Sequence, residues 1–254
     1  MKKLALIFGI LLGSNLFAAA DSDSIKDIRT AVKSLETGAS FSFYDLHLSD
    51  QELKDLQSLQ IKTADQYDNF GKIDAFPQEL RAFLKKVGPN EEGAIEKASK
   101  IIERMVSQLV VASGQEAAHI CMRATVPSPA FDTLRWHVDG YYYEPRTHQY
   151  KFVVSLKGPP TLFYKPSLST REKFLTLLNE DISYQMDAKK RQILADLLND
   201  PSQRFQAEST QGSAFVVGDE AVAAVHSEPP MPVERLFISV IPGTKEQIAE
   251  WQRR

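Results

Sequence analysis

The chain has 254 residues and a formal net charge of −3 at pH 7, with 30 Lys and Arg residues against 33 Asp and Glu residues. This balance gives no electrostatic support for nucleic-acid binding, and the sequence contains no phosphate-cradling loop. A single cysteine, Cys121, excludes an intramolecular disulfide, so the apolar core must hold the fold together.

The first 20 residues have the pattern of a secretory signal peptide. Two lysines precede an apolar run from Leu4 to about Leu16, and the three alanines at residues 18–20 form a small-residue cleavage site. The apolar run is shorter than the roughly 20 residues that a membrane span requires. We therefore predict removal of residues 1–20, export to the periplasm or the medium, and no stable membrane span in the mature chain.

Residues 21–114 are expected to be mostly helical. A capping pattern begins at Ser49, and Pro77 occupies the start of a further helix. Apolar residues at helical spacing predict the longest helix from Asn90 to about Ala112, where Gly114 ends it. We expect these helices to pack on the outside of a sheet; the alternative is an independent helical module joined to a barrel.

The segment Arg135–Gly140 carries an H-x-D pattern at the end of a strand-like run, Thr133 to His137. Because side chains on a strand alternate between faces, His137 and Asp139 are expected on one face, about 6.5–7 Å apart along the backbone. Both side chains can then reach one metal ion. The alternative is that they are ordinary polar residues at the end of a strand.

A second histidine is the candidate for a third ligand. His226 lies between two apolar segments that we predict to be strands, Gly212–Gly218 and Arg235–Ile241. Two neutral imidazoles and one carboxylate on one face of an iron ion leave adjacent positions open for other ligands. The sequence therefore predicts a metal site formed by His137, Asp139 and His226.

The order of these motifs along residues 115–243, about half of the chain, resembles that of a known family. The H-x-D pattern is followed by a strand at residues 150–156, a tight turn at Gly158-Pro-Pro-Thr161, a glycine-led strand before His226, and a basic residue, Arg235. This order is similar to that of the Fe(II)/2-oxoglutarate-dependent dioxygenases. The turn that is Gly-Gly-x-Thr in much of that family is stiffened here by two prolines.

The resemblance implies Fe(II) as the metal, 2-oxoglutarate as the co-substrate, and the three residues above as the iron ligands. It further implies that Arg235 binds the distal carboxylate of 2-oxoglutarate, because a guanidinium offers a planar, two-pronged hydrogen bond. The alternative for Arg235 is a position at the barrel rim, where it would pair in solvent with Glu234 or Glu228.

Two further sets of residues are weaker candidates. Arg135 shares the predicted strand face of His137, so it is a second candidate for contact with a bound carboxylate. Three consecutive tyrosines follow directly after Asp139 and are expected either to contact substrate and co-substrate or to be amphipathic rim residues. They are Tyr141, Tyr142 and Tyr143.

Taken together, the motifs predict an α+β protein built on a double-stranded β-helix, that is, a jelly-roll or cupin-like barrel. Residues 21–254 are expected to form one domain, with the barrel core at residues 115–243 and the helices of residues 21–114 outside it. A helical insertion at residues 165–200 is expected either to form part of the wall over the site or to be a packed surface excursion.

The resemblance implies an exported oxygenase that depends on Fe(II) and 2-oxoglutarate and hydroxylates a small molecule or a peptide that the sequence does not identify. The competing prediction is a cupin-type barrel that binds a metal or small ligand without 2-oxoglutarate turnover. Export favours this alternative somewhat, because Fe(II) and 2-oxoglutarate are chiefly cytoplasmic. A purely structural interaction module would require the order of the motifs to be accidental.

Overall fold

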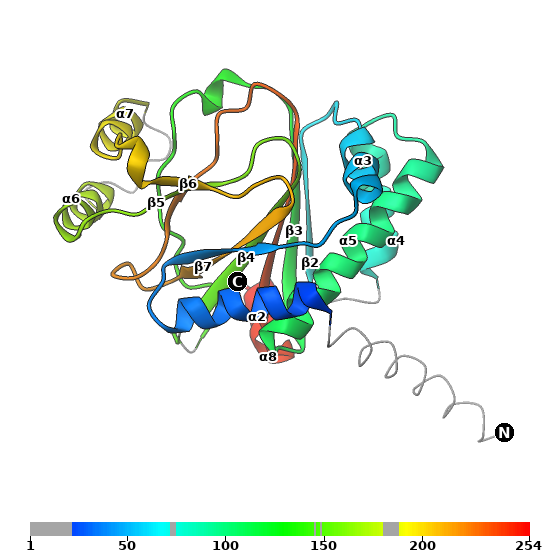
Figure 1. Cartoon of the computed structure of the whole chain (residues 1–254), viewed down its shortest axis with the longest axis horizontal. Coiled ribbons are helices and arrows are strands. Elements are labelled where there is room, and N and C mark those ends of the chain that lie inside the picture. Colours follow the sequence, from blue (N-terminus) through cyan, green and yellow to red (C-terminus); the bar gives the residue numbers. More distant parts are fainter. Residues whose placement is uncertain (1–21, 72–74, 145, 148, 180–187) are drawn as a thin grey trace.

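The computed structural model describes residues 22–71, 75–144, 146–147, 149–179 and 188–254 as a mixed α/β protein with antiparallel sheets (Figure 1). The predicted signal peptide lies outside the described residues. No described helix combines the length and apolarity that a membrane span needs. The helices are α2 (Asp23–Glu36), α3 (Asp50–Ser58), α4 (Phe76–Val87), α5 (Glu92–Ser113), α6 (Leu168–Asn179), α7 (Ala188–Leu197) and α8 (Lys245–Gln252).

The strands form two sheets. The larger sheet has the order β1-β7-β4-β9-β3-β2 and the smaller sheet the order β6-β5-β8, and all of their pairings are antiparallel. The strands are β1 (Phe41–Asp45), β2 (Asp65–Phe70), β3 (Ala117–Thr125), β4 (Gln149–Lys157), β5 (Leu162–Tyr164), β6 (Arg204–Gln206), β7 (Gln211–Val217), β8 (Val225–Ser227) and β9 (Arg235–Gly243).

The predicted strand from Thr133 to His137 is reduced to a single antiparallel bridge, in which His137 and His226 exchange two backbone hydrogen bonds of 2.9 Å. The ladder does not continue toward Thr133, because the backbone N–H of Arg135 donates instead to the Ser227 side chain at 2.9 Å. The segment nevertheless adds His137 to the free edge of β8, so both histidines belong to the smaller sheet.

The prediction that residues 21–114 are mostly helical missed two strands, β1 and β2. Each pairs along one edge of the larger sheet, β1 with β7 and β2 with β3. Such short edge strands are set by their tertiary partners more than by their own periodicity, which is why the sequence did not distinguish them. The longest predicted helix is confirmed as α5, which ends where Gly114 adopts a left-handed conformation with φ of 69°.

The larger sheet has one face toward the N-terminal helices and the other toward the smaller sheet. On β4, Phe152 and Val154 belong to the main core with α2, α4 and α5, whereas Val153 packs with Phe163 of β5 and Phe215 of β7. Figure 1 shows α2, α3, α4 and α5 together on one side of this sheet. The alternation along each strand therefore separates an apolar, helix-covered face from a face that lines the space between the sheets.

The described helices of the insertion, α6 and α7, pack on the outer face of the smaller sheet. Phe174 and Leu194 join a separate apolar cluster with Trp136, Tyr164 and Val225, which point away from the larger sheet. None of the insertion's described residues lines the pocket between the sheets. Of the two alternatives for residues 165–200, the described part matches the packed outer layer; residues 180–187 lie outside the described residues.

Candidate metal centre

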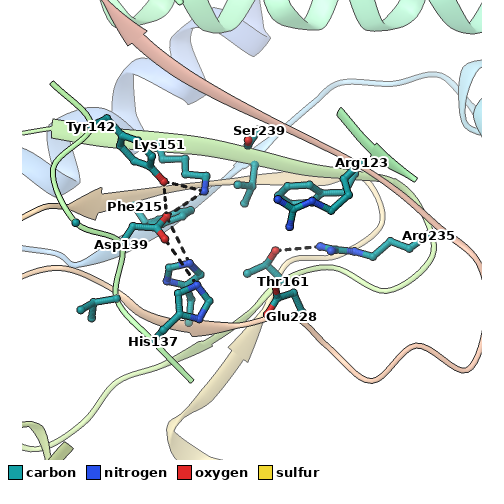
Figure 2. A pocket seen from close by; sticks show the side chains of 15 residues that line it. Arg123, His137, Asp139, Tyr142, Lys151, Thr161, Phe215, Glu228, Arg235 and Ser239 are labelled. Carbon is teal, nitrogen blue, oxygen red and sulfur yellow. Dashed lines mark hydrogen bonds and ion pairs between the residues drawn. The ribbon is translucent and has the colours of Figure 1, made fainter. Parts of the chain in front are cut away.

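Three side chains converge where the bridge, its following loop and β8 meet. The Nε2 atom of His137 lies 3.7 Å from Oδ1 of Asp139, and the Nε2 atom of His226 lies 3.7 Å from Oδ2 of the same carboxylate. One donor atom from each residue falls within 4.8 Å of the others. The structure thus brings together the three residues that the sequence singled out, in a group that could hold a metal ion (Figure 2).

Both imidazoles are oriented by the backbone. Nδ1 of His137 lies 2.7 Å from the carbonyl oxygen of Arg135, and Nδ1 of His226 lies 3.0 Å from the carbonyl oxygen of Ala224. A carbonyl can only accept, so each Nδ1 carries a proton and each Nε2 is the ring nitrogen left to face Asp139 and a metal ion. This is the outer support that metal-binding histidines ordinarily have.

Asp139 is held by two donors on the same oxygen. Its Oδ2 accepts from the Tyr142 hydroxyl at 2.8 Å and from the Lys151 ammonium at 3.0 Å, and Lys151 also lies 3.1 Å from the Tyr142 oxygen. These contacts fix the carboxylate plane and leave Oδ1 directed toward His137. The network leaves one oxygen of Asp139 available for a metal ion (Figure 2).

The charges of this group follow from burial and mutual contact. Burial acts to raise the pKa of Asp139, but Lys151 and the two histidines outweigh it and hold that pKa far below its usual range. Burial acts to lower the pKa of Lys151, but Asp139 outweighs it and raises that pKa. Burial and the nearby His137 lower the pKa of His226 to about 4. His226 is therefore neutral at pH 7, as a metal ligand must be.

The three residues face a pocket of about 420 Å³ between the two sheets. Asp139, His137 and Lys151 lie at one end of this pocket, and Arg235 and Arg123 lie at the other (Figure 2). The volume falls within the range typical of small-molecule sites. One cavity thus joins a candidate metal centre to a pair of guanidinium groups.

Arg235 is buried, with 3% of its surface exposed, at the start of β9. Its Nε donates to the carbonyl oxygen of Pro159 at 2.8 Å, and its Nη2 donates to Thr161 Oγ1 at 3.1 Å and to Ser155 Oγ at 3.2 Å. All of these partners are neutral. Burial lowers the pKa of Arg235 to about 9, so the guanidinium remains a cation at pH 7.

The rim alternative for Arg235 does not describe its surroundings. Glu234 pairs with Lys157 at 3.2 Å, and Glu228 pairs with Arg135 at 3.4 Å. In the part of the chain that the structure describes, no carboxylate forms an ion pair with Arg235. A buried cation without an anionic partner is costly, so its position points to an anion that the pocket receives.

The turn that begins at Gly158 brings the partners of Arg235 into place. Gly158 has φ of 79°, and a Cβ atom built there would lie 2.5 Å from the backbone oxygen of Glu234. Only glycine allows this left-handed conformation and this close approach to the start of β9. The turn then presents the carbonyl of Pro159 and the hydroxyl of Thr161 to Arg235.

The structure places Arg135 away from the pocket. Its guanidinium pairs with Glu228 and lies 4.6 Å from the centre of the Phe131 ring, and it is not among the pocket-lining residues. The shared strand face that suggested a role for Arg135 assumed a regular strand, which the structure does not have there.

Only one of the three tyrosines reaches the pocket. Tyr142 lines it and bonds Asp139, whereas Tyr141 lines a separate surface hollow with Arg146. Tyr143 is buried, and its hydroxyl donates to the carbonyl oxygen of Pro242 at 2.6 Å. The residues after Asp139 follow an irregular path, so consecutive side chains point in different directions.

Sequence reasoning missed Lys151 and Arg123. Lys151 lies between the apolar residues Tyr150 and Phe152. A lone cation within an otherwise apolar predicted strand was the only indication of its role that the sequence offered. Arg123 stands in the same relation to the apolar residues Met122 and Ala124 of β3. Neither residue has a pattern that identifies a partner before the strands are assembled.

No family model matches the sequence, and no curated protein matches it significantly. The chain is similar in structure to a Pseudomonas putida prolyl-4-hydroxylase at 14% identity, with a TM-score of 0.39 over 85% of this chain and 91% of that one. It is similar to a rice dioxygenase for auxin oxidation at 9% identity, with a TM-score of 0.48 over 94% of this chain and 92% of that one.

A third similar structure is HygX from Streptomyces hygroscopicus, described with nickel and 2-oxoglutarate bound. The identity is 12% and the TM-score 0.46, over 85% of this chain and 87% of that one. These likenesses are distant, so the function of this chain has to be argued from its own residues.

Proposed function

We propose that this protein is an oxygenase that depends on Fe(II) and 2-oxoglutarate. The observation that carries the proposal is that one pocket holds both groups: the His-Asp-His group lies at one end, and at the other lies a buried arginine that forms no ion pair with a described carboxylate. A five-carbon dicarboxylate with a keto acid at one end needs a metal for that end and a cation for the other. The pocket offers both.

The donor set fits a divalent iron ion. Two neutral imidazole nitrogens and one carboxylate oxygen are the ligands of the facial arrangement found in non-haem Fe(II) oxygenases, which leaves adjacent positions open. Two donors bound at right angles about 2.1 Å from one ion lie about 3 Å apart. The separation of 3.7 Å between Oδ1 of Asp139, the oxygen left available, and Nε2 of His137 would therefore close by less than about 1 Å.

The arginine end fits the distal carboxylate of 2-oxoglutarate. Arg235 is preorganised by Pro159, Ser155 and Thr161, and the Thr161 hydroxyl lies beside its Nη2 as a second donor for an anion. When bound, Fe(II) and 2-oxoglutarate would supply the oxidation: 2-oxoglutarate and O2 yield succinate and CO2, and one oxygen atom enters a substrate C–H bond. The protein's own residues hold the carboxylates and exclude water.

The strand order supports the proposal. In the larger sheet β7, β4, β9 and β3 lie next to one another, the smaller sheet has the order β6-β5-β8 with His137 added beside β8, and the chain crosses between the two sheets repeatedly. With the His137 bridge in the place of an eighth strand, two four-stranded antiparallel sheets with such crossovers are the arrangement of a jelly roll, with β1 and β2 as additions at its edges. We infer a double-stranded β-helix whose metal group lies between the sheets.

Anaerobic addition of Fe(II) and 2-oxoglutarate tests the proposal. We expect the weak visible absorption band of an iron-bound keto acid, and slow release of succinate when O2 is admitted. If iron binds but 2-oxoglutarate produces neither band nor succinate, the oxygenase is excluded. The barrel would then be a cupin-type protein that binds a metal or small ligand, the second candidate function.

We also propose export, on the evidence of residues 1–20 alone. The mature protein should begin at or near Asp21 and be recovered from the periplasm or the medium. Mass spectrometry of the protein from its native host checks this. An intact chain that begins at Met1 and is confined to the cytoplasm would contradict it.

A further inference from the structure

Arg123 is a second guanidinium group of the pocket, and the proposed co-substrate does not account for it. It lies on β3 and lines the pocket, and its Nε donates to Oε1 of Gln66 at 3.1 Å. Among the described residues, no carboxylate forms an ion pair with Arg123. Its neighbours Met122 and Ala124 belong to the helix-covered core, so Arg123 is on the opposite face of the sheet, which faces the pocket.

The two guanidinium groups flank one phenylalanine. The Arg235 guanidinium carbon lies 4.3 Å from the centre of the Phe237 ring, and Arg123 is the direct cross-strand partner of Phe237. Figure 2 shows both arginines at the end of the pocket away from Asp139 and Lys151. Burial and the charge of Arg123 both act to lower the pKa of Arg235, so the two like charges repel and an anion in this end of the pocket is favoured.

The acidic residues of the pocket are already paired with other cations. Asp139 and Glu228 are the carboxylates among the lining residues that the structure describes. Asp139 is already paired with Lys151 at 3.0 Å, and Glu228 is paired with Arg135 at 3.4 Å. If the distal carboxylate of 2-oxoglutarate neutralises Arg235, one lining cation still has no anionic partner, and it is Arg123.

The two arginines differ in their access to solvent. Arg235 is buried and bonded to three neutral partners, whereas Arg123 belongs to the exposed residues and has one amide partner. Arg235 therefore lies at the inner wall of the pocket, where the proposed co-substrate would bind. Arg123 lies toward solvent, where a molecule that enters above the co-substrate would meet it.

We propose that Arg123 binds an oxyanion of the substrate, so that the protein acts on molecules that carry a carboxylate, phosphate or sulfate group. This inference rests on the proposed oxygenase function. A guanidinium pairs with all three groups through the same two-pronged hydrogen bonds. With its oxyanion bound to Arg123, the substrate would place its reactive C–H bond between Arg123 and the metal group.

Binding of the co-substrate distinguishes the roles of the two arginines. The protein is loaded with Mn(II) and titrated with N-oxalylglycine, an unreactive analogue of 2-oxoglutarate. We expect Arg123→Gln to change the affinity by less than about threefold and Arg235→Gln to lower it by at least about 30-fold. Equal losses in both variants would make Arg123 a co-substrate residue and overturn the proposal.

The oxyanion site is tested directly with inorganic phosphate as the probe. In Mn(II)-loaded protein saturated with N-oxalylglycine, phosphate bound at Arg123 would show saturable enhancement of its phosphorus-31 relaxation by the nearby Mn(II). We expect Arg123→Gln to reduce the enhancement at least about fivefold, Arg123→Lys to retain part of it, and the surface control Arg81→Gln to retain all of it. Equal enhancement in wild type and Arg123→Gln would refute the assignment.

Failure of the oxygenase proposal can be told apart from failure of this one. If wild-type protein does not bind N-oxalylglycine, the proposed function fails. The phosphate titration is then repeated with Mn(II) alone in Arg235→Gln protein, with and without Arg123→Gln. A smaller enhancement of phosphorus-31 relaxation in the variant that lacks Arg123 would still support an oxyanion site there. An unchanged enhancement would exclude that site.

Discussion

The two faces of the larger sheet have opposite chemistry on the same strands. Toward the helices, β4 and β9 present apolar side chains such as Phe152 and Ile238 to the main core. Toward the smaller sheet, the same strands and β3 present Lys151, Ser239 and Arg123 to the pocket. Burial of polar groups costs free energy unless partners compensate, so these polar side chains contribute less to stability than the apolar ones on the helix-covered face.

Stability and ligand binding should therefore be separable between the two faces of this sheet. Substitutions on the helix-covered face should change the free energy of unfolding and leave ligand affinity intact. Substitutions on the pocket face should change ligand affinity, with smaller or opposite effects on stability.

Removal of a histidine from the pocket should abolish tight metal binding. We expect His226→Ala and His137→Ala each to weaken Fe(II) or Mn(II) binding by more than about 100-fold, because each removes one of three ligands. The exposed His47, which pairs with Asp27, gives the control His47→Asn. Anaerobic titration measures all three variants, and unchanged binding in His226→Ala would eliminate the site.

Truncation on the helix-covered face should do the reverse. Ile238 is 1% exposed within the main core, so Ile238→Ala should lower the free energy of unfolding by about 2–4 kcal/mol. Urea denaturation measures this, and Mn(II) affinity of the folded protein should stay within about twofold. The adjacent Ser239→Ala, on the pocket face, should cost less than about 1 kcal/mol. Loss of metal affinity in Ile238→Ala would show that the faces are coupled.

Neutralisation of Lys151 should separate stability from affinity within the pocket itself. In Lys151→Met, Asp139 loses its cationic partner, so the metal-free protein should unfold more easily by about 1–3 kcal/mol. Mn(II) should bind about tenfold more tightly, because a positive charge beside the ion has been removed. Tyr142→Phe keeps the cation and serves as the control. Weaker Mn(II) binding in Lys151→Met would mean that Lys151 chiefly positions the carboxylate.

Acid should destabilise the metal-free protein through its buried neutral imidazoles. Burial lowers the pKa of His119, which contacts Asp68 at 2.8 Å outside the metal group. A histidine whose folded pKa lies below the unfolded value of about 6.5 contributes stability above pH 6.5 that is lost as the pH falls. His119→Gln should make this loss shallower, the smallest of these effects. An unchanged slope between pH 7 and pH 4.5 would contradict it.

The sequence predicted the residues that converge better than the path that brings them together. His137, Asp139 and His226 meet as expected, and Arg235 lies in the same pocket. These positions could be predicted because the order of the strands and the turn residues can be identified from the sequence. The regular strand expected before His137 is absent, and this removes Arg135 from the pocket. Such irregular backbone depends on tertiary hydrogen bonds, which cannot be predicted from the local sequence pattern.

Other features depend on assembly alone. The edge strands β1 and β2 acquire their structure from β7 and β3, and the insertion's position follows from apolar contacts with Trp136. Lys151 and Arg123 were visible only as charges among apolar residues until the sheets placed them around one pocket. Their partners are far apart in sequence, so spacing could not identify them.

Arg235 is proposed to bind the co-substrate and not the metal ion. The most direct measurement is the pair of affinities in Arg235→Ala: Mn(II) alone, and 2-oxoglutarate in the Mn(II)-loaded protein. We expect nearly unchanged Mn(II) affinity and a loss of about 2–4 kcal/mol in 2-oxoglutarate binding, because the variant removes one partner of a buried charge pair. Loss of Mn(II) affinity together with 2-oxoglutarate affinity, or loss of neither, would contradict it.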